Sequence, residues 1–177
     1  ETTCPSGVRY GRLLDIGRKL SEEKLPRCLR DRSVRWLLKH LLPYPQRFAF
    51  LLKSGQLLKP VLPKALRQKI PSVQQVTSLW PASSHQRVML VLAGCAQSVV
   101  TPNTNLAAAR VLNRLGITLV VAEEAGCCGA VEYHLSDTER ARQRMRRNID
   151  AWWPAIEAGA EAVVISASGC GTMVKEY

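Results

Sequence analysis

The chain has 177 residues, of which 46% are hydrophobic and 22% are charged, and it carries a formal net charge of +11. This length allows one domain with a substantial core and a smaller appended region. The charge alone could indicate a nucleic-acid-binding protein, but the basic residues are spread over the N-terminal half and one later helix, without interleaved aromatic residues or a nucleic-acid-binding motif. We therefore expect no nucleic acid as a partner, and we interpret the charge as a basic surface that faces acidic partner subunits or anionic lipid headgroups.

The apolar segments are too short to span a membrane, because a bilayer requires about 18 or more consecutive apolar residues. The longest apolar region, residues 36–52, is interrupted by Lys39, His40, Pro43, Pro45 and Arg47. The sequence begins with Glu1 and shows no signal-peptide pattern, so we expect a piece of a longer cytoplasmic protein. Its six cysteines are then expected to be reduced, and to serve metal binding or redox chemistry instead of forming disulfides.

The N-terminal half, residues 1–86, is predicted to be helical and interrupted by prolines. Residues 10–20 have the pattern of a short helix, and Pro26 suits the first turn of a second helix that runs to about residue 42. The apolar residues of this second helix fall near one face: Leu29, Trp36, Leu37 and Leu41. Six later prolines allow only short helices, and residues 78–87 have the Pro and Ser content of a linker.

From residue 87 onward the pattern changes to alternating strands and helices. The continuous apolar run at residues 88–94 is typical of a strand that is buried on both faces, and the runs at residues 117–124 and 161–169 are predicted to be the second and third strands. Helical periodicity separates these runs, over residues 104–116 and again from Ser136. The order predicts an α/β domain, a βαβαβ unit with a parallel sheet and right-handed crossovers, which corresponds to one half of a Rossmann-like doubly wound fold.

The helix that begins near Ser136 has further features. Ser136 and Glu139 have the spacing of a capping box. An apolar stripe with helical spacing is formed by Ala141, Met145, Ile149, either Trp152 or Trp153, and Ile156. The arginines lie off this stripe and are expected to form a solvated face: Arg140, Arg142, Arg144, Arg146 and Arg147.

Four cysteines follow the three predicted strands. Cys95 comes after the first strand, Cys127 and Cys128 come after the second, and Cys170 comes after the third. Parallel strands end at one edge of a sheet, where open α/β sheets bind their ligands, so the four thiols are predicted to meet in one crevice. A disulfide between two neighbouring cysteines is strained, so we interpret the adjacent pair as two ligands of one inorganic centre.

Glycines accompany each of these cysteines, and Gly126 and Gly129 flank the adjacent pair. Glycine permits tight turns and a close approach to a bulky ligand, so both thiols of the pair can serve the same centre. An all-sulfur site selects zinc or an iron–sulfur cluster. Zinc sites usually contain C-x-x-C, which is absent from the sequence, although His134 could complete a zinc site with three cysteines. The spacing favours iron–sulfur, and zinc remains the alternative.

Other candidate residues carry weaker signals. Cys28 is expected to be a small apolar residue of the core, and His134 a hydrogen-bonded surface residue. Cys4 precedes a proline, as the last cysteine of a ferredoxin cluster motif does. Glu123 and Glu124 are expected to be a solvated pair. The sequence shows no Ser/His/Asp set and no pair of carboxylates placed as acid and base, so we predict no catalytic residue.

The arrangement of cysteines resembles a known family. Cys95, a gap of 31 residues, CCG at residues 127–129 and SGCG at residues 168–171 resemble the cysteine-rich CCG domain of heterodisulfide reductase subunits and related redox proteins. Four longer segments resemble more closely the iron–sulfur subunits of glycolate oxidases: GCAQSVVTPNTNLAAARVLNRLG, EAGCCGAVEYHL, NIDAWWPAIEAGAEA and ASGCGTMVKEY. The segment ETTCPSGVRYGRLLDIGR is similar to the end of the ferredoxin-like domain of the same family.

Members of that family carry two 4Fe–4S clusters in an N-terminal domain, followed by a linker and two CCG repeats. The resemblance implies that residues 1–20 are the tail of the ferredoxin-like domain, with Cys4 as a cluster ligand. It implies further that residues 21–86 are a helical linker and that residues 87–177 are the first CCG domain, truncated at its C-terminus. The residues that it assigns to a further iron–sulfur cluster are Cys95, Cys127, Cys128 and Cys170, with Gly126 and Gly129 beside them.

One feature of the fullest CCG pattern is missing. That pattern ends in C-x-x-C, whereas Ala167 and Met173 stand three residues on either side of Cys170. A cluster with four cysteine ligands, or a site without metal, is compatible with this departure, and a cluster that needs five cysteines is not supported.

The resemblance implies an oxidoreductase subunit that passes electrons from a flavin-containing partner subunit, which oxidises glycolate to glyoxylate, towards a quinone. FAD would belong to the partner, this piece alone would be inactive, and the complex would lie in the cytoplasm, peripheral to the inner membrane of a bacterium. Two alternatives remain: a zinc-stabilised or metal-free docking module, and a redox protein that uses Cys127 and Cys128 as a vicinal dithiol.

Overall fold

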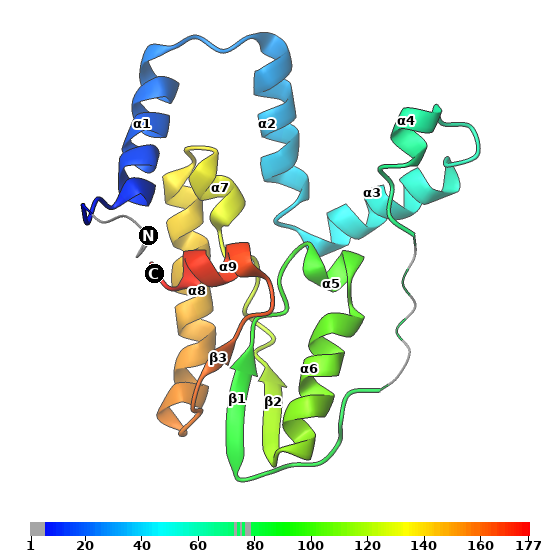
Figure 1. Ribbon diagram of the computed structural model, residues 1–177, viewed down its shortest axis with the longest axis vertical. Coiled ribbons are helices and arrows are strands. Elements are labelled where there is room, and N and C mark those ends of the chain that lie inside the picture. The colour runs from blue at the N-terminus through cyan, green and yellow to red at the C-terminus, as the bar shows by residue number, and fades with distance from the viewer. Residues whose placement is uncertain (1–5, 73, 75, 77–78) are drawn as a thin grey trace.

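Figure 1 shows the computed structural model of the chain, which describes residues 6–72, 74, 76 and 79–177, so Cys4 lies outside it. The N-terminal half contains α1 (Tyr10–Lys24), α2 (Leu29–Leu41), α3 (Pro45–Leu57) and α4 (Lys64–Arg67). The second half contains β1 (Arg87–Val91), α5 (Gln97–Val100), α6 (Asn103–Arg114), β2 (Ile117–Val121), α7 (Ala130–His134), α8 (Thr138–Glu157), β3 (Val163–Val164) and α9 (Ser168–Val174). The predicted α/β class, with a helical segment before it, is confirmed.

In the described part of the chain, three parallel strands form one sheet in the order β2-β1-β3. β1 pairs with the whole of β2, starting with Arg87 opposite Ile117. It pairs with β3 only where Leu90 and Val91 lie opposite Val163 and its neighbour. The chain moves in one direction along the sheet from β1 to β2 and in the other from β2 to β3, so right-handed crossovers require α6 and α8 to cover opposite faces. Figure 1 shows these two helices on opposite sides of the strands.

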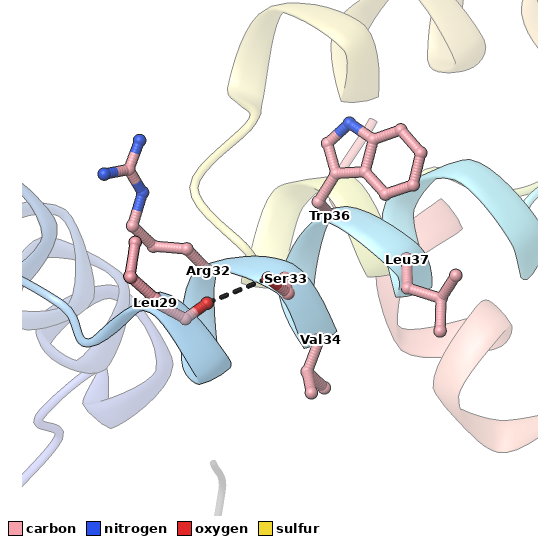
Figure 2. Close-up of a pocket in the computed structure, with 6 residues that line it drawn as sticks. All are labelled: Leu29, Arg32, Ser33, Val34, Trp36 and Leu37. Atoms are coloured by element: carbon pink, nitrogen blue, oxygen red, sulfur yellow. Dashed lines mark hydrogen bonds between the residues drawn. The ribbon is translucent and has the colours of Figure 1, made fainter.

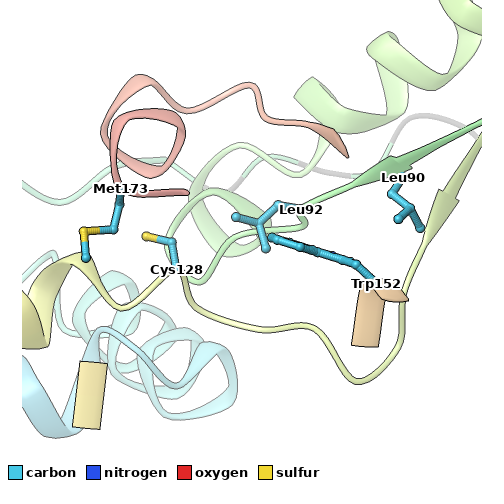
Figure 3. Packing of buried hydrophobic residues seen from close by; sticks show 5 residues of the cluster. All are labelled: Leu90, Leu92, Cys128, Trp152 and Met173. Carbon is cyan, nitrogen blue, oxygen red and sulfur yellow. The ribbon is translucent and has the colours of Figure 1, made fainter. Parts of the chain in front are cut away.

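Alternate residues of β1 enter different cores, because successive side chains of a strand point to opposite faces. On the side of α6, Val91 packs with Ala109 of that helix and with Leu119 of β2. The cluster on the side of α8 is shown in Figure 3 and consists of Leu90, Leu92, Cys128, Trp152 and Met173. A cysteine of the CCG segment is therefore also part of the hydrophobic core.

The start of α8 differs from the prediction. Its N-cap residue is Asp137, whose side chain makes no capping hydrogen bond. Ser136 lies before the helix with a φ of +62°, in the left-handed region. The predicted capping box between Ser136 and Glu139 is therefore wrong, because the chain makes a left-handed turn at the residue that was expected to cap the helix.

The buried face of α8 also differs in part from the predicted apolar stripe. The buried residues of this helix are Ala141, Asn148 and Trp152, whereas Ile149 and Ile156 are exposed. The stripe predicted through the two isoleucines is wrong at these positions, since the helix turns its Asn148 side towards the loop before α7. Of the two tryptophans that the pattern allowed, Trp152 is the core residue.

The N-terminal helices follow the predicted pattern with shifted ends. α1 begins at Tyr10, as predicted, and extends to Lys24. α2 begins at Leu29 with Cys28 as its N-cap, so Pro26 lies before the helix and not in its first turn. α3 has 13 residues, longer than the proline content suggested, because Pro45 stands at the start of the helix, where it is tolerated.

Much of the apolar surface of these helices is exposed. Figure 2 shows an open pocket on α2, where Leu29 and Trp36 stand on the outside and Ser33 donates a 2.9 Å hydrogen bond to the carbonyl of Leu29. The contacts of α2 with the α/β domain are polar: Arg35 donates to the carbonyl of Leu135, and Lys39 forms an ion pair with a side chain at the start of α8. Among the described residues, no helix combines the length and the apolar character that crossing a membrane requires.

The two neighbouring tryptophans of α8 provide a matched test of the core. Trp152 is 4% exposed and Trp153 is 53% exposed. We expect Trp152→Ala to lower the free energy of unfolding by about 3–5 kcal/mol, because it opens a cavity beside β1. Trp153→Ala loses only a surface contact and a hydrogen bond to Glu157, so its effect is expected to stay within about 1 kcal/mol. Urea denaturation of both variants measures the difference, and equal losses would contradict the placement of α8.

Candidate metal centre

The segments that follow the strands carry the cysteines to one edge of the sheet. Cys95 lies between β1 and α5, Cys127 and Cys128 precede α7, and Cys170 lies in the first turn of α9. Figure 1 shows these three short helices beyond the ends of the strands. The structure thus brings together the four cysteines that the sequence places after the strands.

The four thiols contact one another in the order Cys95, Cys127, Cys128 and Cys170. The thiol of Cys127 is hydrogen-bonded to those of Cys95 and Cys128, and the thiol of Cys128 also contacts that of Cys170. Cys170 is partly exposed, the other three are buried, and all four are free thiols. Residues far apart in the sequence therefore share one small sulfur-rich region.

Hydrogen bonds among the four thiols lower the pKa of two of them. A hydrogen bond from Cys127 lowers the pKa of Cys95, and hydrogen bonds from Cys127 and Cys170 lower the pKa of Cys128 to about 3. The hydrogen bond to Cys128 raises the pKa of both Cys127 and Cys170, and burial raises it further. Two of the four sulfur atoms thus favour the charged form, which is the form that binds metals.

Backbone N–H groups point at three of the sulfur atoms. They belong to Ala96, which follows Cys95, and to Gly129 and Ala130, which each lie two residues after the cysteine that accepts. Each of these hydrogen bonds lowers the pKa of the thiol that it reaches, and N–H donors to sulfur also influence the reduction potential of iron–sulfur clusters. Four sulfur atoms, three of them with such donors, fit an iron–sulfur centre, and the same sulfur atoms also fit zinc.

The four thiols do not form a ready-made metal site. Within the described residues, no group of three or more His, Cys, Asp or Glu side chains has an arrangement that could hold a metal ion. Binding of any metal centre at this edge therefore requires the cysteine side chains to change position.

The loop around the cysteine pair requires glycine at one position. Gly129 has a φ of +84°, and a Cβ atom at this residue would lie 3.1 Å from the carbonyl oxygen of Ala141. A side chain would therefore be both strained and too close to α8. Gly126 has a different role, because its N–H donates a 2.8 Å hydrogen bond to Oδ1 of Asn148.

Asn148 holds this loop, and the sequence analysis did not identify it. Its Nδ2 group donates to the carbonyl of Cys127 at 3.2 Å and to the hydroxyl of Tyr177 at 3.0 Å. The Tyr177 hydroxyl in turn donates to the carbonyl of Cys128 at 2.9 Å. Asn148 is spaced seven residues after Ala141 and four before Trp152, so a polar residue within the buried stripe of α8 was the signal that could have revealed it.

A buried ion pair lies next to the thiols. Glu132 of α7 is fully buried and accepts a hydrogen bond from Nε of Arg144, while its Oε2 atom has no partner in the described part of the chain. Burial alone would lower the pKa of Arg144, but the charge and the hydrogen bond of Glu132 raise it above its usual value, with a smaller contribution from Cys127. The guanidinium also lies 4.8 Å from the ring centre of Tyr44. The prediction that Arg144 is solvated is therefore wrong, because this residue joins α7, α8 and the start of α3.

The remaining candidate residues lie away from the thiols or outside the description. His134 is at the end of α7, exposed, with its Nδ1 atom 3.0 Å from a guanidinium nitrogen of Arg18, so the prediction of a hydrogen-bonded surface residue is confirmed. Glu123 and Glu124 are exposed, as expected. Cys28 is exposed at the N-cap of α2, so the prediction that it is a core residue is wrong.

The fold and the cysteines agree with a known family. Residues 89–175 match the family described as CCG, cysteine-rich domain. This part of the chain is therefore a cysteine-rich domain of the CCG family, as the sequence predicted.

Relatives of the chain carry names from glycolate and lactate metabolism. The whole chain is 54% identical over 177 residues to the glycolate oxidase iron–sulfur subunit of Escherichia coli K12, of which it covers 44%. It is 28% identical to the probable glycolate oxidase iron–sulfur subunit of Bacillus subtilis 168, of which it covers 45%. A segment that makes up 47% of the chain is 30% identical to lactate utilization protein A of Bacillus cereus B4264, of which it covers 33%. The chain thus spans less than half the length of these relatives, and no solved structure matches it.

Removal of the Asn148 side chain tests its role in positioning the cysteine loop. Asn148→Ala leaves buried backbone groups of the loop without partners, so we expect a loss of about 2 kcal/mol in stability and faster reaction of Cys127 and Cys128 with a thiol reagent in the native state. Asn113→Ala is the control, because Asn113 accepts hydrogen bonds from Ser83 and His85 on the far side of α6. Equal thiol reactivity in the two variants would show that Asn148 does not hold the loop.

A double-mutant cycle tests the buried pair. Arg144→Met leaves the carboxylate of Glu132 buried without its cation, and we expect a loss of about 3–5 kcal/mol. The double variant Glu132→Leu and Arg144→Met removes both charges and is expected to be more stable than Arg144→Met alone. Glu132→Leu is the second single variant of the cycle. Arg87→Gln is the matched control, because its ion pair with Glu161 is solvent-exposed and should change stability much less. Additive losses in the cycle, measured by urea denaturation, would contradict a direct pair.

Proposed function

We propose that the chain is part of an iron–sulfur subunit that transfers electrons in a glycolate-oxidising enzyme. The contact of four cysteine thiols from three distant segments at one edge of the sheet carries the proposal. The 54% identity over the whole chain to a glycolate oxidase iron–sulfur subunit supports it further.

The cysteines Cys95, Cys127, Cys128 and Cys170 would hold the metal centre, with Gly126 and Gly129 shaping the backbone around it. A bound 4Fe–4S cluster would supply one-electron transfer. The chain itself contributes thiolate ligands, N–H groups at the sulfur atoms, and apolar surroundings that restrict water, which together tune a reduction potential. Arg144 adds a positive charge next to Cys127.

The number of available thiolates favours a cluster with four cysteine ligands. Ala167 and Met173 stand at the two positions where a further cysteine would complete C-x-x-C, and Met173 is a core residue that packs with Leu92 and Trp152. The side chain of Met173 therefore has a packing role in the hydrophobic core. Zinc bound to the same cysteines is the alternative centre, and it would make the domain a structural or docking module.

The other parts of the assembly follow from the family and are proposals as well. Residues 1–20 would be the tail of a ferredoxin-like domain in which Cys4 binds a cluster, residues 21–86 a linker, and residues 87–177 the first CCG domain. A partner subunit with FAD would oxidise glycolate to glyoxylate, and electrons would pass towards a quinone. The chain has no catalytic residue of its own in this proposal, and the complex lies in the cytoplasm at the surface of a bacterial inner membrane.

A metal-free vicinal dithiol is the second candidate function. The observation in its favour is the pKa of Cys128, which is lowered to about 3 by hydrogen bonds from its neighbouring thiols. A thiolate of this kind is a nucleophile when a reagent can reach it. Burial of Cys127 and Cys128 opposes such access, so we place electron transfer through a metal centre first.

Metal analysis of cysteine variants tests the proposal. After anaerobic purification we expect iron and acid-labile sulfide in matching amounts, and loss of both in the variant with Cys127→Ser and Cys128→Ser. Cys28→Ser is the matched control, because Cys28 is exposed on α2, and it should keep the full content. Zinc in place of iron would support the docking module, and a metal-free chain with a rapidly alkylated thiol would support the dithiol. Either result would contradict an iron–sulfur centre on this chain.

A further inference from the structure

Residues 45–71 form a projecting unit that we call the basic arm. It comprises α3, α4 and the turn that follows them, and Figure 1 shows it extending away from the sheet and from α6. The arm folds back on itself: Gln56 donates a 3.0 Å hydrogen bond to the carbonyl of Pro71, and Lys59 donates a 3.2 Å hydrogen bond to the carbonyl of Ile70. Gly55 also lies close to the Ile70 side chain. The arm is therefore a folded hairpin and not an extended linker.

All charged side chains of the arm are positive. The sequence has no acidic residue anywhere between Asp31 and Glu123, and the arm itself carries Arg47, Lys53, Lys59, Lys64, Arg67 and Lys69. The preceding segment differs, because several of its cations have acidic partners: Arg27 pairs with Glu22 and Asp31, and Arg35 also pairs with Glu22. The arm thus presents cations that no acidic side chain of its own neutralises.

Large apolar side chains stand out from the same surface. Phe50 is 75% exposed, Leu57 is 81% exposed and Val61 is 86% exposed. Phe50, Lys53 and Leu57 are spaced by three and four residues and are all exposed, so they share the outward face of α3. Exposed apolar groups between cations are typical of helices that lie in a membrane interface.

We propose that the basic arm binds the surface of an anionic lipid bilayer, with Phe50, Leu57 and Val61 inserted between headgroups. The proposal deepens the peripheral membrane association proposed above by naming the contacting segment and the class of lipid. Lys/Arg side chains near an anionic surface each contribute to attraction, and the apolar side chains add burial.

The composition of the arm favours lipid over an acidic protein as the occupant. Four of its six cations are lysines. Lysine is depleted from the cores of protein–protein interfaces, whereas it is abundant on the polar face of interfacial helices. The 13 residues of α3 are also too few to cross a bilayer, which needs about 20. The arm therefore fits the bilayer surface and not its interior.

Co-sedimentation of the chain with vesicles tests the proposal. We expect binding to vesicles of phosphatidylcholine with phosphatidylglycerol, little binding to pure phosphatidylcholine, and weaker binding at high salt. The variant with Lys53→Gln, Lys64→Gln and Arg67→Gln should bind about 100-fold more weakly, at about fivefold for each charge. Phe50→Ser with Leu57→Ser should also weaken binding, whereas Val111→Ser with Leu115→Ser, which alters exposed apolar residues at the C-terminal end of α6, should not.

A charge-matched control separates the arm from the net charge. Arg110→Gln, Arg114→Gln and Arg146→Gln remove the same number of exposed cations from α6 and α8, and this variant should bind as tightly as the unchanged chain. Equal losses in the two charge variants, or no binding to anionic vesicles at low salt, would overturn the proposal, and the second result would leave an acidic protein as the occupant. The variant with Cys127→Ser and Cys128→Ser should still bind vesicles, so failure of the metal centre and failure of the arm are separate results.

Discussion

Parallel pairing of three short strands is the constraint on which the candidate centre depends. Because β1 pairs in parallel with both β2 and β3, all three strands end at one edge, and each cysteine follows one of these ends. β3 contributes only two residues to the sheet, so its position relies on further contacts. Asn105 supplies them, since its Oδ1 atom accepts hydrogen bonds from Gln97, after β1, and from Ser166, after β3. These hydrogen bonds thus add to the short pairing of β3 with β1 and help to position the end of β3.

The same face of α8 stabilises the core and the cysteine loop. Trp152 packs in the apolar cluster and stacks with Tyr177 at 6.2 Å between ring centres, while Tyr177 and Asn148 bind the carbonyls of the cysteine pair. Cys128 itself belongs to the cluster. Changes in the position of the loop are therefore coupled to the packing of the domain, which is how a folded chain can keep thiols at short range before any metal binds.

The sequence was sufficient for the alternation of strands and helices along the chain, for the class of fold and for the meeting of four cysteines at one edge, because apolar runs and helical periods are local patterns. It was not sufficient for Arg144 and Asn148. Arg144 lies off the apolar stripe of α8 and Asn148 lies on it, but both are polar, and their buried partners, Glu132 and the cysteine loop, are brought to them only by tertiary packing. Cys28 is the opposite case. It was expected to be a core residue, but it is exposed because α2 lies outside the hydrophobic core.

The central claim is that the four cysteines hold one iron–sulfur centre. X-ray absorption at the iron and zinc edges of the anaerobically purified chain tests it most directly, because the method identifies the metal and its ligands together. The account predicts iron with sulfur ligands only and a second iron atom at short range. A zinc signal with a single shell of sulfur ligands, or no metal at either edge, would contradict it.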